Sequence, residues 1–292
     1  MANLKDLRNR IASVTSTQKI TKAMKMVSAS KLKRAQDAAE AARPYAERME
    51  SVLSSLASSM KGQTGGPKLL AGSGADQKQL VVVATSERGL CGGFNTNIIK
   101  AAKLKINALI RDGKDVTIIT IGKKGAGVLK RDYADKMVEH FDLSHVKNLK
   151  FDDASPIGYR LIEKFDAGDF DVCTLFFAKF INVLTQVVTP LQLIPASINT
   201  QGGTDLGRAC YDYEPDENEI LEDLLPRNVR VQLFRALLEN AASEQGSRMT
   251  AMDSATRNAG EMIDSLRTTY NRTRQAVITN ELIEIISGAE AL

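Results

Sequence analysis

A glycine-rich segment is the first place in this chain where chemistry could occur. Residues 86–95, Ser-Glu-Arg-Gly-Leu-Cys-Gly-Gly-Phe-Asn, follow a short apolar run and precede a stretch with helical periodicity. In doubly wound domains, phosphate groups bind where such a turn leads into a helix N-terminus. The glycine spacing matches neither the dinucleotide-binding pattern G-x-G-x-x-G nor the P-loop pattern, and residues 122–127 also fit neither. The segment therefore favours a structural or protein-contact loop, and a nucleotide-dependent enzyme remains an alternative.

Nucleophilic catalysis would require a base beside Cys91. A cysteine near a helix N-terminus can be activated as a nucleophile. The chain has two histidines, His140 and His145, and no orienting motif surrounds either of them. The neighbouring carboxylates Asp152 and Asp153 suit solvated positions better than an acid–base pair. We therefore expect Cys91 to be an unreactive small residue in a tight turn, and we expect no catalytic residue, metal site or cofactor.

The distribution of charge is uneven although the net charge is only +4. Residues 1–35 carry nine basic side chains against the single carboxylate of Asp6, a net charge of +8. Residues 212–223 carry seven acidic side chains and no basic one, a net charge of −7. A basic segment indicates an acidic partner, such as a phosphate backbone, lipid head groups or carboxylate-bearing protein loops. A nucleic-acid-binding coiled coil is therefore a second alternative, although Tyr45 is the only aromatic residue of the first helical arm.

Composition limits the class of protein further. No stretch approaches the roughly 18 apolar residues of a transmembrane helix, so no direct membrane span is expected. The first residues lack the apolar core of a signal peptide. The three cysteines, Cys91, Cys173 and Cys210, are odd in number and widely spaced, which fits a reducing compartment rather than a disulfide framework.

The middle of the chain alternates between strand-like and helix-like segments. Short apolar runs are typical of strands covered on both faces, and such an alternation predicts a small, mostly parallel sheet with helices on its faces. Pro190 favours an edge position for the last strand, which should pair with the strand before it. Strands are expected at residues 80–84, 116–121, 136–141, 172–177 and 186–193, and helices at residues 95–111, 125–130 and 156–165.

Long helices are expected at both ends of the chain. From Leu238 onward, one face can be written with steps that alternate between three and four residues, as in a heptad repeat. Near the start, Leu4, Leu7, Ile11 and Val14 show the same spacing, and Ile20, Met24 and Val27 resume it after a phase slip. Each arm would measure about 80 Å if straight, too long to bury its apolar stripe against the small domain alone. The C-terminal face comprises Leu238, Ala241, Gln245, Arg248, Met252, Ala255, Ala259, Met262, Leu266, Thr269, Thr273, Ala276, Asn280 and Ile283.

Other features of the arms bear on their pairing. Four polar residues stand where a two-stranded coil usually has leucine or isoleucine: Gln245, Arg248, Thr273 and Asn280. They either set the register or mark a stretch toward the C-terminus where the helices separate. Pro44 predicts a bend in the first arm. The Gly-rich, polar segment 199–213 is expected to be a connection.

Several segments together resemble one family, the gamma subunit of the F-type ATP synthase. The resemblance covers essentially the whole chain. It is carried near the start by residues 11–14 and 17–27, in the middle by residues 88–93, and toward the end by residues 242–249, 270–271, 274–276, 278–279 and 281–282.

This resemblance implies an α/β fold class in which the two terminal helices form an antiparallel coiled coil and a small, Rossmann-like α/β domain is inserted between them. The implied divisions are an N-terminal helix at residues 1–60, an α/β foot domain at residues 78–198 and a C-terminal helix at residues 214–292. The implied function is that of a non-catalytic rotor, the central stalk that couples rotation of the membrane c-ring to ATP synthesis by the beta subunits. The implied partners are the alpha and beta subunits, the epsilon subunit and the c-ring, with no nucleic acid.

Particular residues match positions that the family uses. Met24, Arg248, Arg274, Gln275, Thr279 and Glu281 match residues of rotor–stator contact or energy coupling. Arg88, Gly89, Cys91 and Gly92 match a protein-contact loop of the foot. The implied location is peripheral, on the cytoplasmic side of a bacterial inner membrane or, as the alternative, on the matrix face of the mitochondrial inner membrane.

Overall fold

The computed structural model describes residues 3–59, 67–196 and 217–290. These residues form two compact units: residues 1–29 with 248–292, here the paired-helix unit, and residues 30–247, here the α/β unit. The segment 199–213, expected to be a connection, lies outside the described residues. The helices are α1 Leu4–Ser59, α2 Lys68–Ala71, α3 Phe94–Arg111, α4 Lys123–Tyr133, α5 Phe151–Asp166 and α6 Glu217–Glu290, with a 3₁₀ turn at Ala134–Lys136; the strands are β1 Lys78–Ala84, β2 Asp115–Ile121, β3 Met137–Phe141, β4 Val172–Phe180 and β5 Gln186–Ile194.

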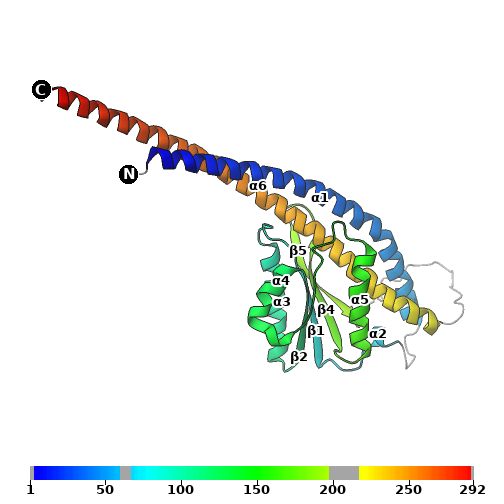
Figure 1. Cartoon of the computed structure of the whole chain (residues 1–292). Helices are drawn as coiled ribbons and strands as arrows, with labels where there is room; N and C mark the ends of the chain where they lie inside the picture. The colour runs from blue at the N-terminus through cyan, green and yellow to red at the C-terminus, as the bar shows by residue number, and fades with distance from the viewer. Residues whose placement is uncertain (1–2, 60–66, 197–216, 291–292) are drawn as a thin grey trace. The chain divides into compact units, whose positions relative to one another are not determined.

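A five-stranded sheet with the order β3-β2-β1-β4-β5 is the centre of the α/β unit (Figure 1). The first four strands are parallel, and β5 pairs antiparallel with β4 at the edge. This order is that of a doubly wound fold, whose direction of winding reverses between β1 and β4. The predicted parallel sheet and the edge position of Pro190 are therefore confirmed.

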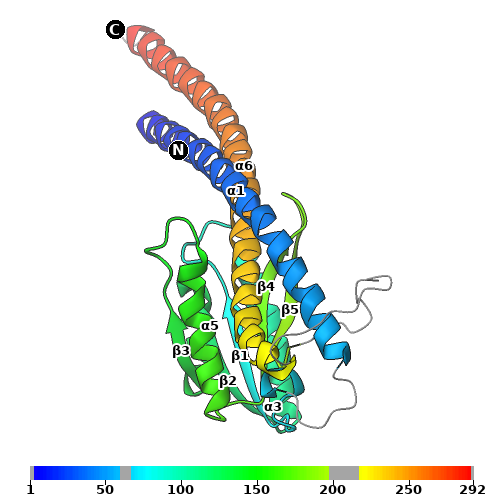
Figure 2. The ribbon, with the colours of Figure 1, turned by 90° about the vertical axis from the view of Figure 1, so that its right-hand side faces the viewer.

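Two apolar clusters cover the two faces of this sheet. On one face, α3 and α4 pack against β1 and β2, with Ile98, Ile106 and Leu129 fully buried. On the other face lie α5, the part of α6 that belongs to this unit and the nearby part of α1 (Figure 2). Leu53 and Leu161 are fully buried there. Because both faces are covered, the central strands β1, β2 and β4 are largely apolar in sequence, whereas the edge strands β3 and β5 are more polar.

Helix α5 begins earlier than the sequence indicated. Its first residue is Phe151 rather than Pro156, because Asp153 accepts a hydrogen bond of 2.8 Å from the main-chain N–H of Lys150 and so caps the first turn. Helix α4 also extends beyond the expected residues 125–130. Pro44 lies inside α1 and does not end it, and the bend expected there stays a prediction.

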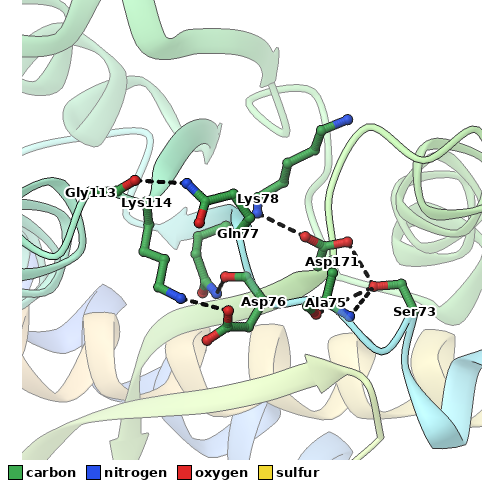
Figure 3. A network of polar contacts seen from close by, with 9 residues as sticks. Ser73, Ala75, Asp76, Gln77, Lys78, Gly113, Lys114 and Asp171 are labelled. Carbon is green, nitrogen blue, oxygen red and sulfur yellow. Dashed lines mark hydrogen bonds and ion pairs between the residues drawn. The ribbon is translucent and has the colours of Figure 1, made fainter.

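A polar network joins the segments that enter β1, β2 and β4 (Figure 3). Asp171 accepts hydrogen bonds from the main-chain N–H of Lys78 at 2.8 Å and from the hydroxyl of Ser73 at 2.7 Å. These hydrogen bonds, together with the charge of Lys78, lower the pKa of the Asp171 carboxyl below its usual value. Beside them, Lys114 forms an ion pair with Asp76 at 2.6 Å. The network therefore stabilises the edge of the sheet at which the parallel strands begin.

In the paired-helix unit, the N-terminal and C-terminal segments lie side by side and antiparallel. Arg8 donates a hydrogen bond of 2.9 Å to the hydroxyl of Tyr270. Farther along, the hydroxyl groups of Thr21 and Thr256 are 2.8 Å apart. The predicted coiled coil of the two chain ends is therefore confirmed, and rising residue numbers in α1 meet falling numbers in α6.

Beyond Met252, every second residue of the predicted inward face of α6 is wrong. Met262 is 52 % exposed, whereas its neighbour Ile263 is 5 % exposed. The inward stripe keeps the heptad spacing but takes steps of four and then three, so every second position falls one residue later than predicted. The stripe comprises Met252, Thr256, Ala259, Ile263, Leu266, Tyr270, Thr273 and Val277, all buried or half-buried.

The phase slip predicted in the N-terminal arm is also wrong. Ile20 and Val27 are both more than half exposed, at 57 % and 56 %. The inward stripe instead continues in step through polar residues, because these find partners on the opposite helix. Lys25, for example, forms an ion pair of 2.5 Å with Asp253, and this contact lowers the pKa of the Asp253 carboxyl. The stripe comprises Leu4, Leu7, Ile11, Val14, Gln18, Thr21, Lys25 and Ser28.

Candidate functional site

The glycine-rich loop that follows β1 is held by its own side chains. The main-chain N–H of Ser86 donates to Oδ1 of Asn95 at 2.9 Å, and the hydroxyl of Ser86 donates to the carbonyl of Arg88 at 2.6 Å. Leu90 has a positive φ of 63°, which is uncommon outside glycine, and its side chain is 64 % exposed. The side chains of Arg88 and Leu90 are therefore exposed on a loop whose backbone is fixed by hydrogen bonds.

Cys91 points the other way, into the protein. It is 2 % exposed, and its Sγ accepts a hydrogen bond of 3.2 Å from the amide of Asn95. His140 instead lies 3.0 Å from the hydroxyl of Thr120. A nucleophilic thiol needs access and a base. The position of Cys91 suits a packed residue that shapes the turn.

Glu87 connects this loop with the loops that follow the two neighbouring strands. Its carboxylate accepts from the main-chain N–H groups of Lys123 at 3.1 Å and Leu143 at 2.8 Å. The loops after β1, β2 and β3 thus form one continuous edge. The carboxylate of Glu87 fixes the positions of these loops. The two main-chain N–H groups that it binds are therefore not available to bind an anion.

The second glycine-rich segment has a structural explanation. Gly122 has a φ of 93°, and a Cβ there would lie 2.3 Å from the carbonyl oxygen of Thr85. At Gly125 a Cβ would lie 2.8 Å from the hydroxyl of Thr85, which accepts a hydrogen bond of the same length from the Gly125 N–H. These glycines allow α4 to approach the end of β1, which explains why their spacing fits no phosphate-binding pattern.

Helix α6 crosses the edge where the parallel strands end. Ser247 donates a hydrogen bond of 2.7 Å to the carbonyl of Cys91, and Ser243 donates one of 2.8 Å to the carbonyl of Ala178 in β4. In a doubly wound sheet, a nucleotide would bind between β1 and β4 at this edge. In this structure α6 occupies that position, so the loop serves as a packing site for a helix. The alternative of a nucleotide-dependent enzyme gains no support.

Within the described parts of the chain, no three His, Cys, Asp or Glu side chains come together as a metal site. A search of the same residues finds no helix with both the length and the apolar character needed to cross a membrane.

Comparison with known proteins gives a consistent result. Residues 3–292 match a protein family described as "ATP synthase". The chain is 60 % identical over 294 residues to a protein of Parvibaculum lavamentivorans and 61 % identical over 292 residues to one of Ruegeria pomeroyi, both named "ATP synthase gamma chain". Each alignment covers 100 % of both chains.

The chain belongs to the ATP synthase gamma chain family.

Solved structures agree with this membership. A chain in the mitochondrial ATP synthase central stalk and c-ring of Tetrahymena thermophila aligns with a TM-score of 0.60 at 27 % identity, covering 81 % of this chain and 99 % of that one. A chain from the mitochondrial ATP synthase of Euglena gracilis aligns with a TM-score of 0.68 at 18 % identity, covering 99 % and 94 %. The second likeness shows the fold alone.

The residues expected from the resemblance to serve in coupling lie in separate places. Arg274, Gln275, Thr279 and Glu281 are exposed on the last turns of α6, where Thr279 donates its hydroxyl to the carbonyl of Gln275. Met24 and Arg248 are half-buried, in α1 and α6 respectively. Of the matched loop residues, Arg88 and Gly92 are exposed, Gly89 is half-buried and Cys91 is buried.

The sequence offered a stretch where the helices separate as one reading, but it did not indicate that the unpaired end of α6 is largely apolar. Arg8 meets Tyr270 only a few residues after α1 begins, whereas α6 continues to Glu290. Among the described residues, no helix lies opposite α6 beyond Val277. Five apolar side chains are therefore about half exposed or more: Ile278, Leu282, Ile283, Ile285 and Ile286. Comparison of the pairing register with the lengths of the two arms could have located this surface from the sequence.

Proposed function

We propose that this chain is the central rotor of a proton-translocating F-type ATP synthase. As a rotor, it couples rotation of the c-ring to the conformational cycle of the beta subunits, which make ATP. Membership of the gamma chain family supports this function. The structural observation that carries it is the antiparallel pairing of the two chain ends, because paired long helices make an element stiff enough to transmit torque.

The proposed partners follow from this role. The alpha and beta subunits surround the paired helices, and the epsilon subunit and the c-ring bind the α/β domain. The basic side chains at the start of α1 suit carboxylate-bearing loops of the surrounding subunits. The chain itself contributes no catalytic group, so it is not an enzyme alone. Its place is peripheral, on the cytoplasmic side of a bacterial inner membrane, and its relatives named in the comparisons are bacterial.

The proposed contact surfaces differ in chemistry. The exposed end of α6 combines apolar side chains with Arg274, Gln275, Thr279 and Glu281, and it contacts loops of the beta subunits. Such contacts must be re-formed at each catalytic step, so no single contact can be worth many kcal/mol in one rotational position. Met24 and Arg248 contribute to coupling along the helices. The loop containing Arg88, Gly89, Cys91 and Gly92 is a protein contact of the foot.

We propose three divisions of the chain with two roles. The two terminal helices, residues 1–60 and 214–292, form the shaft, and residues 78–198 form the foot that receives rotation from the c-ring. Part of each terminal helix also packs in the α/β unit.

Reconstitution with purified alpha and beta subunits tests the function. The chain should increase cooperative ATP hydrolysis by the alpha–beta ring, and a low-resolution image should place the paired helices in the cavity of the ring. A chain in which residues 1–29 have been deleted lacks the part of α1 that belongs to the paired-helix unit and is the matched control. If the full chain neither stimulates hydrolysis nor enters the cavity, the rotor function is refuted.

A further inference from the structure

Three polar side chains of α6 are buried on one face of the helix although they belong to no apolar stripe. Asn240, Ser243 and Ser247 are spaced three and four residues apart, which places them on the same side of the helix. Their exposed fractions are 5 %, 0 % and 7 %. Buried polar groups are costly unless they are hydrogen-bonded, so each must have a partner.

All three side chains bond to the main chain at the edge where the parallel strands end. Oδ1 of Asn240 accepts from the N–H of Ala178 at 3.0 Å, and Ser243 donates to the carbonyl of the same residue. The β1–β4 ladder reaches only Phe176, so α6 supplies partners for a β4 residue just beyond it. Ser247 donates to the carbonyl of Cys91, in the loop after β1. One helix thus connects the end of β4 with the loop that follows β1.

Close packing accompanies these hydrogen bonds. Gly246 lies between Ser243 and Ser247 in the same turn region, and a Cβ there would be 3.3 Å from the ring of Phe180 and 3.7 Å from the carbonyl of Val183. The absence of a side chain at Gly246 lets α6 approach the β4–β5 hairpin. This close contact, like the hydrogen bonds, depends on which face of α6 meets the hairpin.

Elsewhere in this unit, α6 makes apolar contacts with the core, and Arg230 donates hydrogen bonds to Ser155 at 3.3 Å and Tyr159 at 2.6 Å in α5 rather than to the sheet. Leu225, Leu233 and Leu237 are buried in the core of the α/β unit. Apolar burial is non-directional, whereas hydrogen bonds require a defined distance and angle. A turn of α6 about its axis would take both partners from the buried main-chain groups of Ala178, at the cost of desolvation. It would also remove Ser247 from the carbonyl of Cys91, which would keep only the N–H of Phe94 at 3.2 Å.

We propose that Asn240, Ser243 and Ser247 form a clasp that fixes the rotational register of α6 on the α/β domain. They are positioning residues. Because they hold α6 in place on the domain, torque on the domain is transmitted to α6 and does not rotate the helix relative to the domain. This inference rests on the proposed rotor function.

The test uses the complete bacterial ATP synthase in inverted membrane vesicles, assembled with this chain. ATP-driven proton pumping and ATP hydrolysis are measured on the same preparation. The variants Asn240→Leu and Ser243→Ala with Ser247→Ala remove the hydrogen bonds with little change in volume. Ser254→Ala and Ser265→Ala, at exposed serines of the same helix, are matched controls, and Ser247→Thr retains the hydroxyl group.

The clasp variants should lower the ratio of proton pumping to hydrolysis, whereas the controls and Ser247→Thr should keep the ratio of the unchanged chain. A purely structural role would reduce assembly, and with it pumping and hydrolysis together, without changing their ratio. In the isolated chain, hydrogen exchange of the Ala178 amide should rise roughly 5–10-fold in Asn240→Leu.

Assembled clasp variants with an unchanged ratio would overturn the proposal. If a variant does not assemble, unchanged exchange at Ala178 in Asn240→Leu overturns it as well. Failure of the rotor function itself would look different, because the unmodified chain would then restore no pumping to a complex lacking its own gamma subunit.

Discussion

Asp171 shows how one side chain can hold two segments of a sheet at its edge. Its carboxylate receives the N–H of Lys78, the first residue of β1, and the hydroxyl of Ser73 in the preceding loop (Figure 3). Because these contacts lower the pKa of Asp171 in the folded chain, the ionised form contributes stability above the unfolded pKa near 4. That contribution is lost as the pH falls through the folded pKa.

Replacement of Asp171 by asparagine should therefore destabilise the chain at neutral pH. Each hydrogen bond to an exposed carboxylate is worth little, so we expect a loss of roughly 1 kcal/mol in the free energy of unfolding. The measurement is denaturant unfolding at pH 7 and at pH 3, and the difference from the unmodified chain should shrink at the lower pH. Asp112→Asn, at an exposed aspartate after α3, is the control. An equal effect of Asp171→Asn at both pH values would contradict the role of the charge.

Residue types alone showed that the glycines of residues 122–127 fit no phosphate-binding pattern, but not why they are there. The requirement for Gly122 comes from Thr85, 37 positions earlier in the sequence, whose carbonyl leaves no room for a Cβ. The contact of α6 with the Cys91 loop could not be predicted either, because Ser247 and Cys91 are 156 residues apart in the chain.

The positions of the helices and strands were predicted better than any other feature of the chain. The strands and most helices follow from apolar runs and helical periodicity, because the sheet is covered on both faces. The inward faces of the paired helices were harder to predict. In α6, small and polar residues occur at neighbouring positions, so two heptad phases fit the sequence about equally well. In α1, the polar residues Gln18, Thr21 and Lys25 hid the continuing stripe, because their partners belong to the other helix.

The register of α6 can be tested with two adjacent residues. Ile263→Ala should destabilise the paired helices by roughly 2–4 kcal/mol, because a buried isoleucine is removed. Met262→Ala should change stability by less than about 0.5 kcal/mol, because its side chain is largely in solvent. Thermal unfolding followed by circular dichroism compares the two variants. If the two variants lost equal stability, or if Met262→Ala lost more, the inward face that the sequence predicted would be the correct one.

At the scale of the whole molecule, the chain divides its apolar surface between stability and interaction. The α/β unit buries its apolar residues on both faces of a sheet, and the paired helices bury theirs along a shared seam. The last turns of α6 bury almost none, since their side chains extend beyond the start of α1. A surface of this kind marks a site of protein contact. Stability and coupling should therefore separate when the end of α6 is changed.

Removal of residues 283–292 makes this separation measurable. The deleted stretch includes Ile283, Ile285 and Ile286, which are 55 %, 67 % and 58 % exposed, so the isolated chain loses little burial and its thermal unfolding should be unchanged. In a complex with alpha and beta subunits, the same deletion should weaken rotor–stator contacts and lower the torque measured in single-molecule rotation. Deletion of the first ten residues removes Leu7, which is 4 % exposed, and should destabilise the paired helices instead. A C-terminally shortened chain that unfolds would mean that these turns belong to the folded core, and full torque would mean that the contact surface lies elsewhere.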